Sequence, residues 1–316
     1  MDGHTIRVAA TRTGLSPHLI RVWERRYGAV VPKRTDTNRR MYSDQEIDRL
    51  NLLRQATEAG ESISQIAGLS REELTRLVAG PPPTAAPAER VAGKSAPGSA
   101  DYLTRGLNAT RDLDAPSLES VLMQASTDLS QPVLLNEVIE PLMRRIGELW
   151  QDGELRVANE HLASAVVRSF LGSMLAAHQP HDSHLRLIAT TPTGVLHEHG
   201  SLVAAITAAS TGWHVTYLGP NLPAEDIAGA VTQEGARIVA LSLAYPSDDP
   251  RIAQELLRLR RLLPDGVSII VGGTTANSYA STLDSIGAIR VESIAGLRHE
   301  LVRLSKTAPP KATDTE

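Results

Sequence analysis

The chain has 316 residues, a hydrophobic fraction of 41% and a formal net charge of −4. Single cores rarely exceed about 250 to 300 residues, so this length predicts two or three domains. No run of roughly 18 apolar residues is present and the N-terminus lacks a secretory signal, so we expect a cytoplasmic protein without a membrane span. The absence of cysteine excludes disulfides, thiolate metal sites and cysteine nucleophiles.

The positive charge is concentrated at the N-terminal end. Residues 1–40 hold nine Lys or Arg and three Asp or Glu, which gives a local balance of +6 within an otherwise mildly acidic chain. This part of the chain is therefore a candidate polyanion-binding surface.

The first predicted elements are two short helices separated by a tight turn, within residues 6–26. Gly14 breaks the first helix, Ser16 stands where an N-cap belongs, and Pro17 occupies the first position of the second helix. Residues 30–43 form a basic loop between two β-prone runs, as a wing would. Side chains left free for solvent or phosphate are His18, Arg21, Arg25, Arg26, Lys33, Arg34, Arg39 and Arg40.

Three runs then resemble one family: IRVAATRTGLSPHLIRVWERRYG from Ile6, PKR from Pro32, and RRMYSDQEIDRLNLLRQATEAGESISQIA from Arg39. Together they resemble the winged helix-turn-helix of the MerR family. The resemblance implies a recognition helix in the major groove of double-stranded operator DNA and a wing on the adjacent backbone. Without it, the arginines could equally be a solvated helix face. Trp23, Tyr27 and Tyr42 are expected to pack in the core of this domain, residues 1–79.

The next segment, residues 80–100, is rich in Pro, Ala, Gly and Ser and is predicted to be a flexible linker. It replaces the long dimerisation helix of MerR-family dimers. Oligomerisation is therefore expected to come from the C-terminal part, as a homo-oligomer between dimer and tetramer. Residues 101–180 have apolar residues at helical spacing and predict a four-helix bundle.

After Pro180 the pattern changes to short β-rich runs that alternate with helices. Strands are expected in LRLIATT, HVTYLG, RIVALSLA and SIIVGG, with helices from Ser201, from Ala224 and near 253–263. This alternation predicts a doubly wound, Rossmann-like α/β domain over residues 181–306. Residues 307–316 are expected to be a disordered tail. The predicted fold class is thus multidomain.

A candidate ligand site lies at the carboxyl edge of this predicted sheet. His197 follows the first strand, three residues before Gly200, and doubly wound folds bind ligands at that edge. Ser242, Gly272 and Gly273 end two further strands there, and glycine lets a large flat ligand approach the backbone. These residues alone also fit an ordinary loop histidine.

The runs HEHG, GWHVTYLGPNLP, SLAYP and VGG resemble the cobalamin-binding domains of methionine synthase, the corrinoid mutases and the CarH/LitR-type regulators. The resemblance implies that His197 is the lower axial ligand of cobalt and Gly200 the helix-opening glycine. Ser242, Gly272 and Gly273 would line the slot for the nucleotide tail. Val195 replaces the acidic residue that bonds the far ring nitrogen of the ligand in this family, which should either weaken cobalt ligation or leave that task to a backbone carbonyl or water. Glu198 and His199 are not expected to point the same way as His197.

The run IGELWQDGELRVANEHLASAVVRSFL, from Ile146, resembles the bundle that caps cobalamin in the CarH/LitR-like regulators. This implies contacts from Trp150, Val157 and Glu160 to the adenosyl group of adenosylcobalamin, with the next residue, His161, as a further cofactor-binding residue. The alternative is that Trp150 is a core residue and that Glu160 and His161 form an interhelical bond. The photoreceptors carry a His at the position of Gln151, so a cobalt ligand is missing there.

Together these resemblances imply a cobalamin-dependent, light-responsive photoreceptor and transcriptional repressor that binds DNA and is not an enzyme. One alternative is a corrinoid methyl-carrier or mutase subunit, which would have no reason to carry a winged helix-turn-helix. Another is a MerR-like regulator that has lost cobalamin and senses another ligand, pigment or protein partner, with Val195 and Gln151 as marks of that change.

Overall fold

The computed structural model describes residues 3–15, 17–35, 39–58, 63–79, 98–180 and 183–306. The chain divides into two compact units, Met1–Val167 and Arg168–Glu316, and each is taken by itself below. Most of the predicted linker and the whole predicted tail, residues 307–316, lie outside the described residues, as does Ser16. Within the described part, no helix is both long and apolar enough to cross a bilayer.

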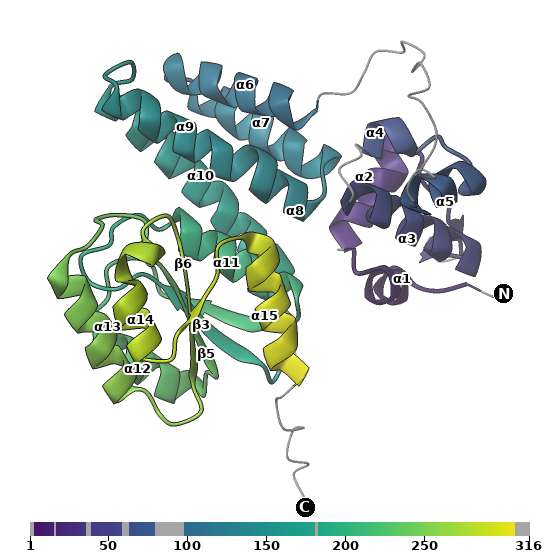
Figure 1. Cartoon of the computed structure of the whole chain (residues 1–316). Helices are drawn as coiled ribbons and strands as arrows, with labels where there is room; N and C mark the ends of the chain where they lie inside the picture. Colours follow the sequence, from purple (N-terminus) through teal and green to yellow (C-terminus); the bar gives the residue numbers. More distant parts are fainter. Residues whose placement is uncertain are drawn as a thin grey trace, which may run out of the picture. The chain divides into compact units, whose positions relative to one another are not determined.

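The N-terminal part of the first unit is a small helical domain with a two-stranded hairpin (Figure 1). Its elements are α1 (Ile6–Thr13), α2 (Pro17–Tyr27), β1 (Lys33–Arg34), β2 (Arg40–Met41), α3 (Asp44–Glu58), α4 (Ile63–Ile66) and α5 (Arg71–Ala79). Gly14 ends α1 with φ of 70°, a left-handed conformation that glycine adopts without strain, as the sequence predicts. Trp23 and Tyr42 are fully buried, which confirms them as core residues, and Tyr27 is half-buried.

The start of α3 is fixed by a capping box. The Ser43 amide donates to the Glu46 carboxylate at 2.8 Å, and the Glu46 amide donates back to the Ser43 hydroxyl at 3.3 Å. Ser70 and Glu73 repeat this exchange at the start of α5. The first cap fixes the start of α3 directly after the hairpin, and the second fixes the start of α5.

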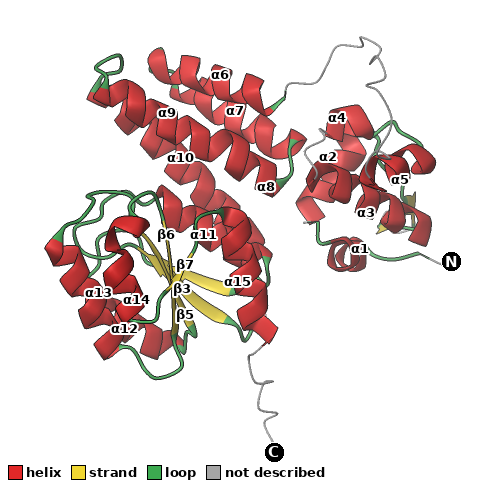
Figure 2. Ribbon diagram, viewed as in Figure 1, coloured by secondary structure: helices red, strands yellow, loops and turns green. Residues whose placement is uncertain are grey.

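The remainder of the first unit is a helical bundle, which confirms that part of the predicted fold class (Figure 2). Its elements are α6 (Ser99–Arg111), α7 (Ala115–Asp128), α8 (Gln131–Val133), the π-helical turn η1 (Leu134–Ile139), α9 (Glu140–Gln151) and α10 (Val157–His178). Helix α10 runs on into the second unit. The apolar periodicity did not indicate the π turn, which ends just before Pro141; proline has no N–H to continue the ladder, and the widened turn accommodates it.

The second unit is a parallel sheet between two layers of helices, as predicted (Figure 2). Its elements are β3 (Arg186–Thr190), α11 (His199–Ser210), β4 (His214–Tyr217), α12 (Ala224–Glu234), β5 (Ile238–Ser242), α13 (Pro250–Leu262), β6 (Ser268–Gly272), η2 (Ala276–Tyr279), α14 (Ala280–Ser285), β7 (Ile289–Arg290) and α15 (Ile294–Lys306). Strand β7 was not predicted, because two residues give no periodicity. Helices α11 and α15 cover one face, and α12, α13 and α14 the other (Figure 1).

The strand order β4-β3-β5-β6-β7 places a topological switch point between β3 and β5. The connection from β3 leads to β4 on one side, and the chain then crosses back to β5 on the other side of β3. Two neighbouring strands whose connections leave in opposite directions open a crevice at their carboxyl ends. The carboxyl ends of β3 and β5 border this switch point: His197 lies in the loop after β3, and Ser242 is the last residue of β5.

Candidate cofactor and DNA-binding sites

The loop between β3 and α11, residues 191–198, is hydrogen-bonded within itself and to Asn221 in the loop after β4. The Thr191 hydroxyl donates to the Val195 carbonyl and accepts from the Asn221 amide at 2.9 Å. The Gly194 amide donates to the Asn221 side chain at 2.8 Å, and Gly194 has φ of 92°. The backbone that carries His197 is therefore pre-organised before any ligand binds.

His197 itself is exposed. Its ring lies 6.1 Å from that of Tyr245 at an interplanar angle of 73°, and no hydrogen bond from another described residue reaches its imidazole. Val195 is fully buried in the apolar core and offers no polar partner. Leu196 and Tyr245 are 68% and 65% exposed, so the imidazole stands among apolar side chains that a flat ligand could cover.

Ser242 and Gly200 meet at the switch point. Ser242 is 4% exposed, and its hydroxyl makes no hydrogen bond within the described part of the chain. A Cβ on Gly200 would lie 2.3 Å from that hydroxyl oxygen and 3.3 Å from the Ser242 Cβ, so a larger residue would crowd α11 against β5 and force the hydroxyl to another rotamer. A nearly buried hydroxyl without a partner fits a polar group of a ligand.

Gly273 also stands where a Cβ does not fit, here against protein backbone. A Cβ on Gly273, whose φ is 105°, would lie 2.4 Å from the Leu243 carbonyl oxygen. Its lack of a side chain is thus already needed for packing the loops after β5 and β6, independent of any ligand. A Cβ on Gly272 would lie 3.2 Å from a methyl group of Val291, a tight contact that a small shift of that side chain relieves.

Sequence reasoning gave no role to Glu198, although it lies in a connected polar group. Its carboxylate is 12% exposed; one oxygen is 2.7 Å from Nε of Arg168 on α10, and the other accepts from the Tyr217 hydroxyl at the end of β4. Burial, and then the bond to Glu198, raise the pKa of Tyr217, so this hydroxyl remains a donor. No spacing rule connects positions 168, 198 and 217, because they meet only through the fold.

In the first unit, the candidate adenosyl contacts lie at the end of α9 and the start of α10. Trp150 and Val157 are 44% and 50% exposed, so Trp150 is not the core residue of the alternative interpretation. The Glu160 carboxylate accepts from the Ser164 hydroxyl at 2.7 Å. Nε2 of His161 lies 3.6 Å from the other oxygen of Glu160, and because both residues are on α10, the contact of Glu160 with His161 is not interhelical. Gln151 is exposed. Exposed apolar surface beside a half-buried carboxylate fits a nucleoside.

The basic residues of the N-terminal domain divide into two groups. Exposed side chains are those of Arg21, Arg25, Arg26, Lys33, Arg34 and Arg39. Arg40 differs, because its Nε donates to both carboxylate oxygens of Glu24 on α2, at 3.0 and 2.7 Å. Glu24 also accepts from the buried Tyr42 hydroxyl at 3.3 Å. Because Arg40 lies on β2 and Glu24 on α2, their ion pair joins the hairpin to α2. Nothing is described for the side chain of His18.

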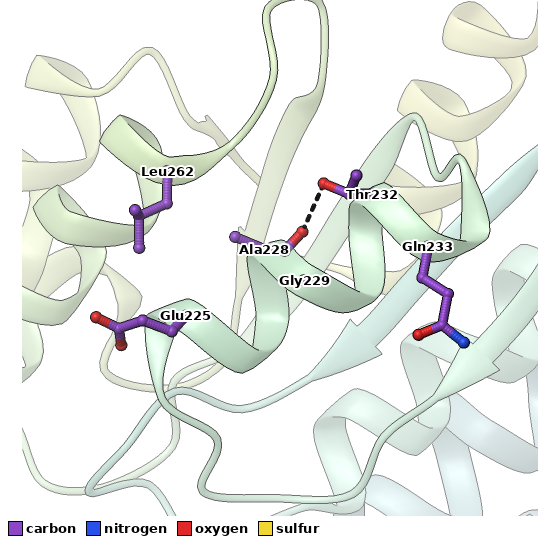
Figure 3. Close-up of a pocket in the computed structure, with 6 residues that line it drawn as sticks. All are labelled: Glu225, Ala228, Gly229, Thr232, Gln233 and Leu262. Atoms are coloured by element: carbon purple, nitrogen blue, oxygen red, sulfur yellow. Dashed lines mark hydrogen bonds between the residues drawn. The ribbon is translucent and has the colours of Figure 1, made fainter.

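A hollow of about 520 Å³ lies on the outer surface of α12 beside the end of α13 (Figure 3). It is lined by Glu225, Ala228, Gly229, Thr232, Gln233 and Leu262. Glu225 is paired with Arg258, and the Thr232 hydroxyl bonds the Ala228 carbonyl at 3.0 Å. The hollow contains none of the candidate residues, and these polar groups are already paired.

Three segments of the chain match known domain families. Residues 4–73 match the MerR HTH family regulatory protein, and residues 102–173 and 185–293 each match a B12 binding domain. Each match falls on a part of the chain where the structure shows the corresponding elements.

Two curated relatives align with nearly the whole chain. The HTH-type transcriptional repressor CarH of Myxococcus xanthus is 35% identical over 90% of this chain and 93% of its own length. The HTH-type transcriptional repressor CarA of the same organism is 31% identical over 91% of this chain and 92% of its own. Both names are those of repressors, not of enzymes.

Among solved structures, the monomethylamine corrinoid protein of Methanosarcina barkeri superimposes with a TM-score of 0.54 and 13% identity. The match covers 66% of this chain and all of that one. At this identity the comparison shows a shared fold.

Proposed function

This chain belongs to the family of MerR-type transcription regulators that carry B12-binding domains, and we propose that it is a repressor controlled by adenosylcobalamin and light. The observation that carries the proposal is the presence, in one chain, of a helix-turn-helix and two B12-binding segments aligned end to end with named repressors. These observations do not favour a corrinoid enzyme subunit, since such a subunit would have no use for a helix-turn-helix.

The residues of each unit fit a part of this cofactor. His197 would bind cobalt, and the hydroxyl of Ser242, beside Gly200, would bond the nucleotide tail near Gly272 and Gly273. Trp150, Val157, Glu160 and His161 would contact the adenosyl group. When bound, the cofactor supplies a cobalt–carbon bond that visible light breaks. The described residues hold no cluster of three or more metal-binding side chains, so the metal would arrive within the corrin.

The proposed roles of the domains follow from this. Residues 1–79 would bind operator DNA through α2 and the hairpin, and residues 101–180 and 181–306 would bind the cofactor and assemble copies of the chain. Linking several DNA-binding domains in one oligomer raises their effective concentration at one operator. Loss of the adenosyl group would weaken this assembly and release the DNA.

The test is size-exclusion chromatography and operator binding of the purified protein, with and without adenosylcobalamin, in the dark and after illumination. We expect a larger oligomer and tighter operator binding in the dark with cofactor, and loss of both after light. Trp150→Ala should abolish the adenosyl-dependent assembly and cost less stability than truncation of a core tryptophan, because this side chain is 44% exposed. Assembly and operator affinity that do not change on illumination of the loaded protein would contradict light control.

The second candidate function is a regulator of this family that senses something other than cobalamin. It is favoured by the buried Val195, which cannot support the ligand ring, and by Gln151, a poor cobalt ligand. A visible absorption spectrum after dark incubation with adenosylcobalamin and gel filtration separates the two. Absence of any bound corrinoid would favour the second function.

A further inference from the structure

The imidazole of His197 has no hydrogen-bond partner among the described residues that would fix its orientation. In a metal-binding histidine, the N–H of the second ring nitrogen usually donates a hydrogen bond to a carboxylate, carbonyl or water, and this bond fixes the orientation of the ring. Here no described residue is bonded to the imidazole, and the side chain at position 195 is a buried valine. The direction of the imidazole then depends on how firmly the peptide that carries it is held.

That peptide is held through the next residue. Glu198 is the N-cap residue of α11, and its carbonyl accepts from the Ser201 hydroxyl at 2.8 Å and from the Leu202 amide at 3.1 Å. Its side chain points inward, with each carboxylate oxygen on a different element: Arg168 of α10 and Tyr217 of β4. Both the backbone and the side chain of the residue beside the ligand are therefore fixed.

The Arg168 contact also links the loop to a particular helix. On α10, Glu160, Ser164 and Arg168 are spaced four residues apart, so they follow one another along one side of the helix, and Ser164 already donates to Glu160 at 2.7 Å. The helix that bears the candidate adenosyl contact thus bears, two turns later, the cation that holds Glu198. No other described element makes both connections.

We propose that Arg168, Glu198 and Tyr217 form a clamp that positions His197 for cobalt and ties its loop to α10. The clamp rests on the proposed function, since it concerns the orientation of that ligand. Its members are positioning residues that act through the backbone of residues 197–198. Loosening them should weaken ligation without removing the ligand.

The test compares Glu198→Gln, Glu198→Ala, Tyr217→Phe and Arg168→Met with two controls. His197→Ala defines complete loss of ligation. Arg186→Met breaks a surface ion pair of the same domain, with Glu234 at 2.9 Å, at the amino end of the sheet away from the loop. Each protein is loaded with cobalamin, and the cobalt is reduced by one electron and examined by electron paramagnetic resonance. Histidine labelled with the heavy nitrogen isotope distinguishes a protein ligand from the cofactor's own base.

We expect the equilibrium constant for histidine ligation to fall about 10- to 100-fold in the clamp variants, most in Glu198→Ala and less in Glu198→Gln. Arg186→Met should match the wild type. In the cofactor-free protein, amide hydrogen exchange of residues 191–198 should accelerate in the same order. Loss of stability alone would accelerate exchange throughout the domain, whereas loosening of the clamp accelerates it in residues 191–198 and leaves the rest of the sheet unchanged.

Two results would overturn the clamp, and they differ in what else they overturn. Wild-type protein with histidine on cobalt, and clamp variants that match Arg186→Met in ligation and exchange, would refute the clamp and leave the proposed function intact. Wild-type protein that binds no cobalamin, or binds it without a histidine nitrogen on cobalt, would refute the clamp together with the site on which it rests.

Discussion

At the switch point, α11 approaches β5 most closely at Gly200, which faces Ser242. A Cβ there would meet the Ser242 hydroxyl oxygen at 2.3 Å and the Ser242 Cβ at 3.3 Å. Gly200→Ala should therefore cost about 1 to 3 kcal/mol of unfolding free energy and reduce cobalamin uptake, because it overpacks this contact. Denaturant titration and cobalamin binding measure the two effects.

The control for this substitution is Gly229→Ala, in the middle of α12, where an added Cβ meets nothing within 4 Å. This change should be neutral or stabilise by about 0.5 to 1 kcal/mol. Removing the Ser242 hydroxyl should recover most of the loss, so the double variant Gly200→Ala, Ser242→Ala should be more stable than Gly200→Ala alone. Additive effects of the two substitutions would contradict a direct clash.

At the scale of elements, the hairpin is tied to α2 through Arg40 and Glu24, whereas Lys33 and Arg39 extend freely from it. Lys33→Ala or Arg39→Ala should lower operator affinity and reduce the slope of log affinity against log salt by about 1 each, if each neutralises one phosphate. Arg40→Met should lower the stability of the domain and leave this slope nearly unchanged. A full reduction of the slope by Arg40→Met would identify it as a phosphate contact instead.

In the bundle, α6 and α7 are joined by the Tyr102 hydroxyl, which donates to the 3%-exposed carboxylate of Asp128. Tyr102→Phe leaves this buried acceptor without that donor and should destabilise the bundle by about 1 to 3 kcal/mol. Burial first, and then Asp128, raise the pKa of Tyr102 above its unfolded value of about 10. The contribution of the Tyr102 hydroxyl to the free energy of unfolding is therefore complete below about pH 10 and is lost as the pH rises further.

The same variant provides the measurement. Unfolding free energy of the wild type should decline above about pH 10, and Tyr102→Phe should decline less steeply, so that the difference between the two narrows. Equal slopes for both proteins would show that Tyr102 does not carry this pH dependence.

For the whole molecule, the sequence predicted what depends on local periodicity and on motifs. The domain order, the bundle, four of the five strands of the parallel sheet and the burial of Trp23 followed from these signals. The clamp at Glu198, the pairing of Arg40 with Glu24 and the π turn before Pro141 did not. Each depends on residues brought together by tertiary packing, or on a backbone adjustment that apolar spacing does not record.

The proposed coupling of cofactor to DNA binding is reciprocal by thermodynamic necessity. If adenosylcobalamin tightens operator binding by some factor in the dark, operator DNA must tighten adenosylcobalamin binding by that same factor, typically about 5- to 150-fold. The measurement is the cofactor dissociation constant of the protein alone, with operator, and with a scrambled duplex of equal length. The scrambled duplex controls for electrostatic attraction to the basic N-terminal domain, whose residues 1–40 hold a balance of +6. Operator that leaves cofactor affinity unchanged, at equilibrium, would contradict the coupling in both directions.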